Sequence, residues 1–217
     1  MAGDFYDAFL LPDGKLMFLV ADVCDKGIGA ALFMTLFRSL IRAASTGIQF
    51  SPTQAQPLTP SEQLLHTVSL TNNYVAETHE AANMFATVFI AILDAHSGQV
   101  WYINCGNDPA LIISGDGSVR DQLKPTGPVV GALSNSRYKV EETRLTPDEM
   151  ILAFTDGIPD TKNAGGEFFG VTRLTDLLSP KDTPTALLEK VAAALASFSG
   201  ETEQFDDITL MGIKRKA

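Results

Sequence analysis

The sequence predicts an α+β fold in which sheets pack together and helices lie on their outside. Short apolar runs alternate with turn residues, and two pairs of runs have the spacing of hairpins. After residue 27 a long stretch repeats its apolar residues at helical spacing instead. The chain has 217 residues, of which 45% are hydrophobic, so it can bury a sizeable core. We therefore expect one domain over residues 1–217.

The first part of the chain is expected to contain one strand and two helices. Residues 15–22 form an apolar run that ends on an acid, which is typical of a buried strand. Residues 27–44 follow as a helix, and Gly47 with three prolines makes residues 47–60 a loop. A second helix of about twenty residues begins at Thr59, because Pro60 in a first helical turn is favourable.

The rest of the chain reads as strands joined by turns, followed by two helices and a last strand. The two hairpins are expected at residues 85–93 with 99–105 and at residues 110–113 with 119–123. Residues 138–145 and 150–154 are expected to pair as a third antiparallel couple. Helices are expected at 171–178 and 184–198, and the chain closes with a strand at 208–213.

Composition excludes some functions. The formal net charge is −10, so no basic patch is present to neutralise phosphates, and we expect no nucleic-acid partner. The sequence shows no run of eighteen apolar residues, so direct membrane insertion is not expected. Cys24 and Cys105 are too few for a disulfide framework and suit a reducing cytoplasm.

Four aspartates stand beside apolar runs: Asp4, Asp22, Asp156 and Asp206. A carboxylate at the edge of a core is costly unless a cation meets it. These acids have no matching Lys or Arg nearby in sequence, so the common partner would be a divalent hard cation. Each acid alone reads about as readily as a turn residue. Together they indicate a metal enzyme.

An ordered set of motifs surrounds these acids: Gly3–Asp7, Ala21–Gly27 with Ala30–Met34, Thr155–Gly157 and Phe205–Thr209. The set resembles the bacterial metal-dependent serine/threonine phosphatases of the PPM (type 2C) class, and among them the SpoIIE-like phosphatases of sigma-factor partner switching. The resemblance covers residues 3–213. It implies a four-layer α-β-β-α sandwich of two antiparallel sheets flanked by helices. It also implies a first strand before Gly3, which this sequence lacks, so we expect an open sheet edge that favours a homodimer.

The resemblance implies a site that holds two Mn²⁺ or Mg²⁺ ions. Its catalytic and metal-ligating residues would be Asp4, Asp22, Asp156 and Asp206, joined by the carbonyl of Val23. Asp160 would hold a third, weakly bound metal. A metal-activated water would then attack phosphorus directly, without a covalent enzyme intermediate. No His stands beside Asp22, so the leaving-group proton has three open sources: a metal-bound water, Lys26, or no protein group.

The function implied is hydrolysis of phosphoserine or phosphothreonine in a regulatory protein, with an anti-sigma-factor antagonist as the expected substrate. The chain would be the C-terminal output domain of a longer cytoplasmic protein, which carries an upstream sensor or receiver module and which could be tethered to a membrane in full length. The alternative is a catalytically weak adaptor that binds a phosphoprotein in partner switching. All four acids are present, which favours the enzyme.

Overall fold

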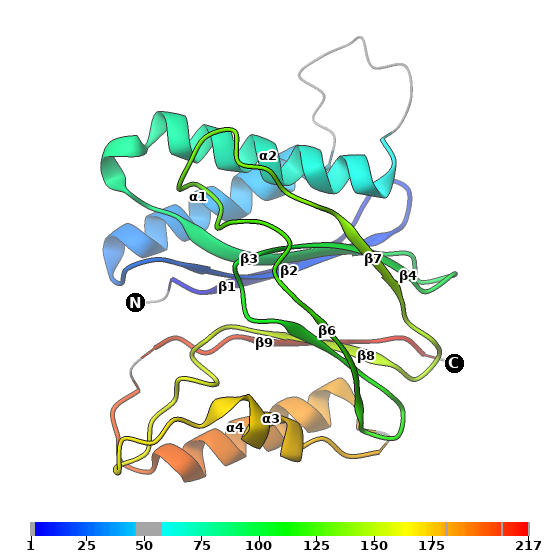
Figure 1. The fold of residues 1–217 in the computed structure, drawn as a ribbon, viewed down its shortest axis with the longest axis vertical. Coiled ribbons are helices and arrows are strands. Elements are labelled where there is room, and N and C mark those ends of the chain that lie inside the picture. The colour runs from blue at the N-terminus through cyan, green and yellow to red at the C-terminus, as the bar shows by residue number, and fades with distance from the viewer. Residues whose placement is uncertain (1–2, 47–57, 181, 205, 217) are drawn as a thin grey trace. The chain divides into compact units, whose positions relative to one another are not determined.

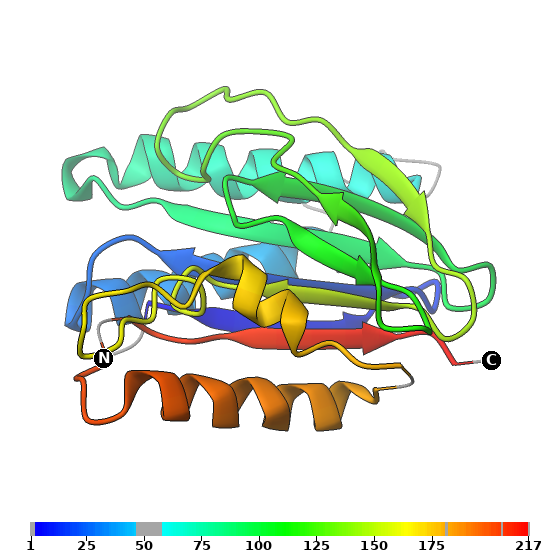
Figure 2. The same ribbon diagram turned by 60° about the horizontal axis from the view of Figure 1, so that its bottom comes forward.

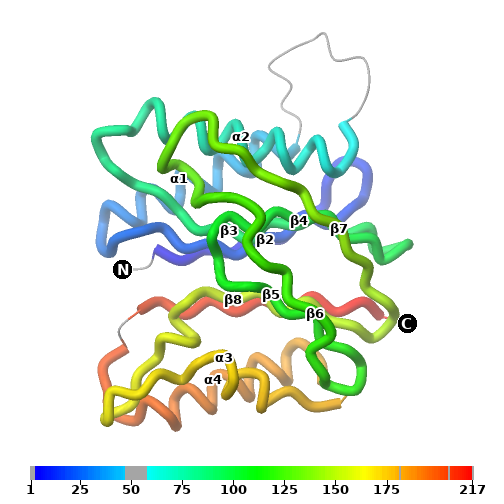
Figure 3. The backbone as a smooth tube through the Cα atoms, in the orientation of Figure 1, coloured from blue at the N-terminus to red at the C-terminus, as the bar shows by residue number. Residues whose placement is uncertain are grey.

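The computed structural model describes residues 3–46, 58–180, 182–204 and 206–216. The chain divides into two compact units: unit 1 is Met1–Asn107 with Pro125–Arg144, and unit 2 is Asp108–Lys124 with Leu145–Ala217. The chain therefore passes from one unit to the other three times, and Figure 3 traces its path. That residues 1–217 form a single domain stays a prediction. Most of the loop expected at 47–60 lies outside the described residues.

Unit 1 contains a five-stranded antiparallel sheet in the order β1-β2-β3-β4-β7. Its strands are β1 (Phe5–Leu10), β2 (Leu16–Val23), β3 (Ala86–Leu93), β4 (Gln99–Cys105) and β7 (Glu141–Arg144). Two helices, α1 (Ile28–Ser45) and α2 (Pro60–Thr78), cover one face of this sheet, and the short η1 (Glu80–Ala82) follows them (Figure 1). Phe37 of α1 and Leu64 of α2 are fully buried in the core that results.

Unit 2 contains a four-stranded antiparallel sheet in the order β6-β5-β8-β9. Its strands are β5 (Ala110–Ile113), β6 (Val119–Leu123), β8 (Met150–Phe154) and β9 (Leu210–Lys214), and its helices are α3 (Gly170–Asp176) and α4 (Pro184–Ser199). Side chains of both helices, among them Leu174 and Leu187, join the buried cluster around Leu152 and Phe154 of β8. Figure 2 shows the two helices alongside this sheet.

Two antiparallel sheets flanked by helices are thus present, and most element positions are confirmed. The expected pair of residues 138–145 with 150–154 is wrong, because β7 pairs with β4 while β8 lies between β5 and β9. All five residues of β8 are buried, which suits a central strand. In contrast β7 alternates between half-buried and exposed residues, and its polar side chains suit a sheet edge, where Glu142 accepts a hydrogen bond from Gln99.

Strand β1 was not predicted from the sequence. It lies at one edge of the sheet order, next to β2. The odd-numbered residues of β1 are the more buried ones. One of them is Asp7, which interrupts the apolar pattern that marks a half-buried strand. Self-association through this edge stays a prediction.

Helix α1 is the one described helix that is long and apolar enough to cross a membrane by length and composition alone. The expectation that no segment reaches this limit is therefore corrected. The helix carries Arg38 and Arg42, and it packs on α2 and on β1 and β2 through Ala30, Phe37 and Ile41. Those contacts are the ones that a core helix makes.

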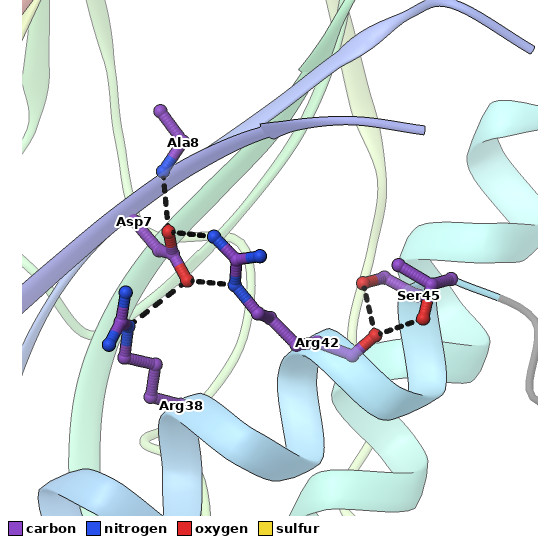
Figure 4. Close-up of polar contacts among 6 residues, drawn as sticks. Asp7, Ala8, Arg38, Arg42 and Ser45 are labelled. Atoms are coloured by element: carbon purple, nitrogen blue, oxygen red, sulfur yellow. Dashed lines mark hydrogen bonds and ion pairs between the residues drawn. The ribbon is translucent and has the colours of Figure 1, made fainter. Parts of the chain in front are cut away.

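Asp7 joins β1 to α1. It is only 4% exposed, and it accepts hydrogen bonds from Arg42 through both guanidinium positions Nε and Nη2, and from Nε of Arg38 at 3.1 Å (Figure 4). Burial alone would raise the pKa of Asp7, but the hydrogen bonds and charges of Arg42 and Arg38 outweigh it and lower that pKa. The Arg42 guanidinium also stacks 4.4 Å from the centre of the Phe9 ring.

We expect Asp7→Asn to lower the free energy of unfolding by about 2 kcal/mol at neutral pH, because the charge-assisted hydrogen bonds are lost. The pKa of Asp7 is lower in the folded chain than in the unfolded chain. Its contribution is therefore complete above the unfolded value of about 3.9 and disappears as pH falls through the folded value. Urea denaturation of both proteins across this range measures the difference.

The matched control is Asp13→Asn, which removes a carboxylate paired with Lys15 at the surface. We expect a change within about 0.5 kcal/mol there. An equal loss in both variants, or a loss in Asp7→Asn that persists at low pH, would contradict the role given to the Asp7 ion pairs.

Candidate metal centre

In unit 1 the predicted ligands Asp22 and Val23 are the last two residues of β2, and they pair with Thr87 and Ala86 of β3. The chain segment before β1 lies against this strand end, because the Val23 N–H donates to the Gly3 carbonyl at 3.3 Å. A Cβ on Gly3 would lie 2.6 Å from the Val23 carbonyl oxygen and 3.2 Å from Oδ1 of Asp22. Only glycine fits at this position. Because Gly3 has no side chain, its backbone can lie beside two of the predicted donor oxygens, the Val23 carbonyl oxygen and Oδ1 of Asp22.

The turn after β2 owes its shape to backbone conformations that few residues adopt. Asp25 and Gly27 both have positive φ, 69° and 95°, and Gly27 leads into α1. Between them and the strand, the Cys24 sulfur accepts a hydrogen bond from the Phe85 N–H at 3.2 Å. Burial, with some help from Asp25 and Asp22, raises the pKa of the Cys24 thiol, so it does not have the character of a nucleophile.

In unit 2 the loop after β8 and the segment before β9 are bound together. The Thr155 N–H donates to the Thr209 carbonyl at 3.1 Å, and the Thr209 N–H donates to Oγ1 of Thr155 at 3.0 Å. Next to this pair a Cβ on Gly157 would lie 1.8 Å from the Asp207 carbonyl oxygen. The backbone of the Thr155–Gly157 motif therefore packs directly on the Asp206–Asp207 pair, with no room for a side chain.

Asp160 belongs to the same loop as Asp156, since its N–H donates to the Asp156 carbonyl at 2.8 Å. A pocket of about 400 Å³ in unit 2 has both Asp160 and Asp206 in its lining. Two of the predicted metal ligands, more than forty residues apart in sequence, thus border one hollow.

Asp108 is a residue that the sequence analysis missed. It directly precedes Pro109 and β5, and the pKa of its carboxyl is raised by burial and then by the negative charge of Asp160. A bound cation would relieve the repulsion between the half-buried Asp108 carboxylate and the exposed Asp160 carboxylate. The signal was available, because Asp108 borders an apolar run just as Asp22 does.

Among the described residues, no group of three or more His, Cys, Asp or Glu side chains is close enough to hold a metal. Asp4 and Asp22 belong to unit 1, whereas Asp156, Asp160 and Asp206 belong to unit 2. The convergence of these acids on one site therefore stays a prediction. The donors that each unit offers are carboxylate and carbonyl oxygens, which are the ligands of hard divalent cations, so the residues fit Mg²⁺ or Mn²⁺.

A family model described as stage II sporulation protein E (SpoIIE) matches residues 12–216. Protein IcfG of Synechocystis is 38% identical over 99% of this chain and 36% of its own length. The phosphoserine phosphatase RsbU of Bacillus subtilis is 27% identical over 100% of this chain and 60% of its own length. The chain thus spans less than two thirds of either relative.

Among solved structures, the SiaA-PP2C domain of Pseudomonas aeruginosa matches with a TM-score of 0.78 at 24% identity. The match covers 98% of this chain and 80% of that one. At this identity the likeness shows the fold, and the predicted fold class is confirmed.

Proposed function

Because the chain belongs to the SpoIIE family of PP2C-type phosphatase domains, we propose that it hydrolyses phosphoserine or phosphothreonine in a regulatory protein. The observation that carries the proposal is the oxygen-only donor set at the ends of β2 and β8. In each unit a glycine admits a second backbone segment beside these donors, Gly3 at Val23 and Gly157 at Asp207. Such close approaches serve a site that must gather several oxygens in a small space.

The predicted ligands come from both units. Asp4, Asp22 and the Val23 carbonyl would hold ions from unit 1, and Asp156 and Asp206 from unit 2. Asp160, with Asp108 beside it, would hold the third and weakest ion. When bound, two Mn²⁺ or Mg²⁺ ions supply a water of near-neutral pKa and positive charge for the phosphoryl oxygens.

The chain's own residues favour direct hydrolysis over a covalent intermediate. Neither cysteine is suited to attack phosphorus, because burial raises the pKa of both the Cys24 and the Cys105 thiols. The aspartates would hold the ions, whose positive charge would align the phosphoryl group with a water for attack. The close packing of Gly157 on the Asp207 carbonyl supports this role, since it fixes the backbone that carries Asp156 and Asp206.

The proposed substrate is a phosphorylated protein of a partner-switching pathway, with an anti-sigma-factor antagonist as the leading candidate. RsbU carries the name phosphoserine phosphatase, which supports the substrate class. We further propose that the reaction takes place in the cytoplasm, where the two free thiols Cys24 and Cys105 remain reduced. A sensor or receiver module in the longer protein would control it.

The test is hydrolysis of p-nitrophenyl phosphate by the purified chain after EDTA treatment, with Mn²⁺, Mg²⁺ or no metal added back. We expect turnover that depends on the metal, since the predicted ligands are oxygen donors, which hard divalent cations prefer. Isothermal titration calorimetry with Mn²⁺ measures the affinity of the chain for the metal separately from turnover. A folded chain that binds Mn²⁺ yet turns over no substrate would favour the phosphoprotein-binding adaptor instead.

A further inference from the structure

The pocket of unit 2 that borders Asp160 and Asp206 has an apolar side with no assigned occupant. Its lining combines the loop after β8, the C-terminal half of α4 and the segment that leads into β9. Ala192, Leu195 and Ala196 of α4 form the apolar wall together with Ile208. Ile208 is 38% exposed although it is a large apolar side chain. Figure 1 shows α4 and β9, the elements that flank this part of unit 2.

Three of the polar side chains that line the pocket already contact other parts of the chain. The Thr161 hydroxyl donates to the Gly157 carbonyl at 2.6 Å, and the Gln204 amide donates to the Asp206 carbonyl at 2.8 Å. The Lys162 ammonium lies 4.8 Å from the centre of the Phe168 ring. The apolar wall itself offers no hydrogen-bonding side chain, so an apolar group would bury itself against it.

The charged residues that border the pocket also favour a neutral occupant. The pocket borders three carboxylates, Asp160, Glu203 and Asp206, and one ammonium, Lys162. If Asp160 and Asp206 hold metal ions as proposed above, the remaining Glu203 and Lys162 balance each other. A neutral occupant then meets no uncompensated charge.

We propose that this pocket receives an apolar side chain of the phosphoprotein substrate, one that flanks the phosphorylated serine or threonine. The inference rests on the proposed function, because the pocket shares Asp160 and Asp206 with the proposed metal centre. A phosphoserine bound at that centre would bring its flanking residues close to these two acids, and so to the pocket that they border. At about 400 Å³ the pocket has ample room for a side chain as large as leucine.

The test uses fluorescently labelled peptides in which a non-hydrolysable phosphonate replaces phosphoserine. Each flanking position in turn carries Leu, Ala or Lys, and fluorescence anisotropy in Mn²⁺ buffer gives the dissociation constants. At one flanking position we expect Leu to bind about tenfold more tightly than Ala, because its larger side chain leaves water. The readout is the ratio of the Leu and Ala affinities, which a uniform loss of binding does not change.

Two variants and a control assign the preference to the pocket. Ala196→Phe fills it and Ile208→Ala removes part of its apolar wall, so we expect either to reduce the ratio to about twofold or less. The matched control is Ala193→Phe, an exposed position on α4 outside the pocket lining, which should keep the full ratio. Melting curves confirm that all three variants fold.

Several outcomes would overturn the proposal: no binding of any peptide, a preference for Lys, no preference for Leu at any position, or a ratio that Ala196→Phe and Ile208→Ala leave unchanged. Failure of the proposed function looks different. In that case the chain hydrolyses no p-nitrophenyl phosphate, while the Leu preference and its loss in Ala196→Phe persist.

Discussion

Replacing Asp156 by asparagine is expected to lower metal-dependent turnover of p-nitrophenyl phosphate by about a thousandfold, the upper end of the scale on which the loss of one electrostatic contact to the reacting group lowers rates. Asparagine keeps the size of the side chain but loses the charge that binds a divalent ion. Asp22→Asn is expected to do the same from unit 1. Turnover at saturating and at limiting Mn²⁺, with titration calorimetry for Mn²⁺ affinity, measures both effects.

The matched control is Asp121→Asn on β6, which removes a carboxylate that is exposed. We expect unchanged turnover in this variant, because Asp121 is not one of the predicted ligands and a single exposed charge has little effect. Full activity in Asp156→Asn or Asp22→Asn, in a folded protein, would remove that residue from the ligand set. Loss in the control as well would point to a general effect of net charge.

The second large effect is expected at Gly157. In Gly157→Ala the new Cβ would stand 1.8 Å from the Asp207 carbonyl oxygen and 2.9 Å from the carbonyl carbon, so the backbone must shift. Neither group is the end of a side chain that turns away. We expect a loss of about 3 kcal/mol in unfolding free energy, the scale of overpacking at a rigid contact. Because Asp206 adjoins the displaced group, Mn²⁺ affinity should fall as well.

Gly115→Ala is the control in the same unit. There the nearest atom to a new Cβ is Cβ of Asp148 at 3.5 Å, an ordinary contact, and we expect a change within about 0.5 kcal/mol. Chemical denaturation reports stability, and calorimetry reports Mn²⁺ binding. If Gly157→Ala kept both the stability and the affinity of the parent chain, the backbone contact with Asp207 would have no part in shaping the site.

The sequence was informative wherever a segment's own pattern decides its structure. Helix α2 begins where Thr59 and Pro60 predict it, and its capping box with Glu62 forms as such residues favour. The sequence did not predict strand β1, because Asp7 is paired with Arg38 and Arg42, which lie more than thirty residues further along the chain. A buried carboxylate reads as a surface residue until its partners are known.

Strand pairing was the weaker part of the prediction. Residues 138–145 and 150–154 were paired because they are neighbours in sequence, yet β7 finds its partner in β4, about forty residues earlier. The site residues differ in the same respect, since some follow from a local pattern and others depend on a distant partner. Asp22 and Val23 follow from one strand end, whereas the importance of Asp108 depends on Asp160, fifty-two residues later. Contacts of this range leave no trace in local periodicity.

The threefold passage of the chain between the units has a consequence for dissection of the gene. A fragment that ends at Asn107 lacks β7, so the β4 edge loses its partner. A fragment that starts at Asp108 carries Pro125–Arg144 away from the sheet that β7 completes. No single cut in the chain separates unit 1 from unit 2, because each unit is built from two separate stretches of sequence. Neither unit can therefore be encoded alone by one continuous piece of the gene. Gain or loss of this fold in a genome is therefore expected to involve the whole of it.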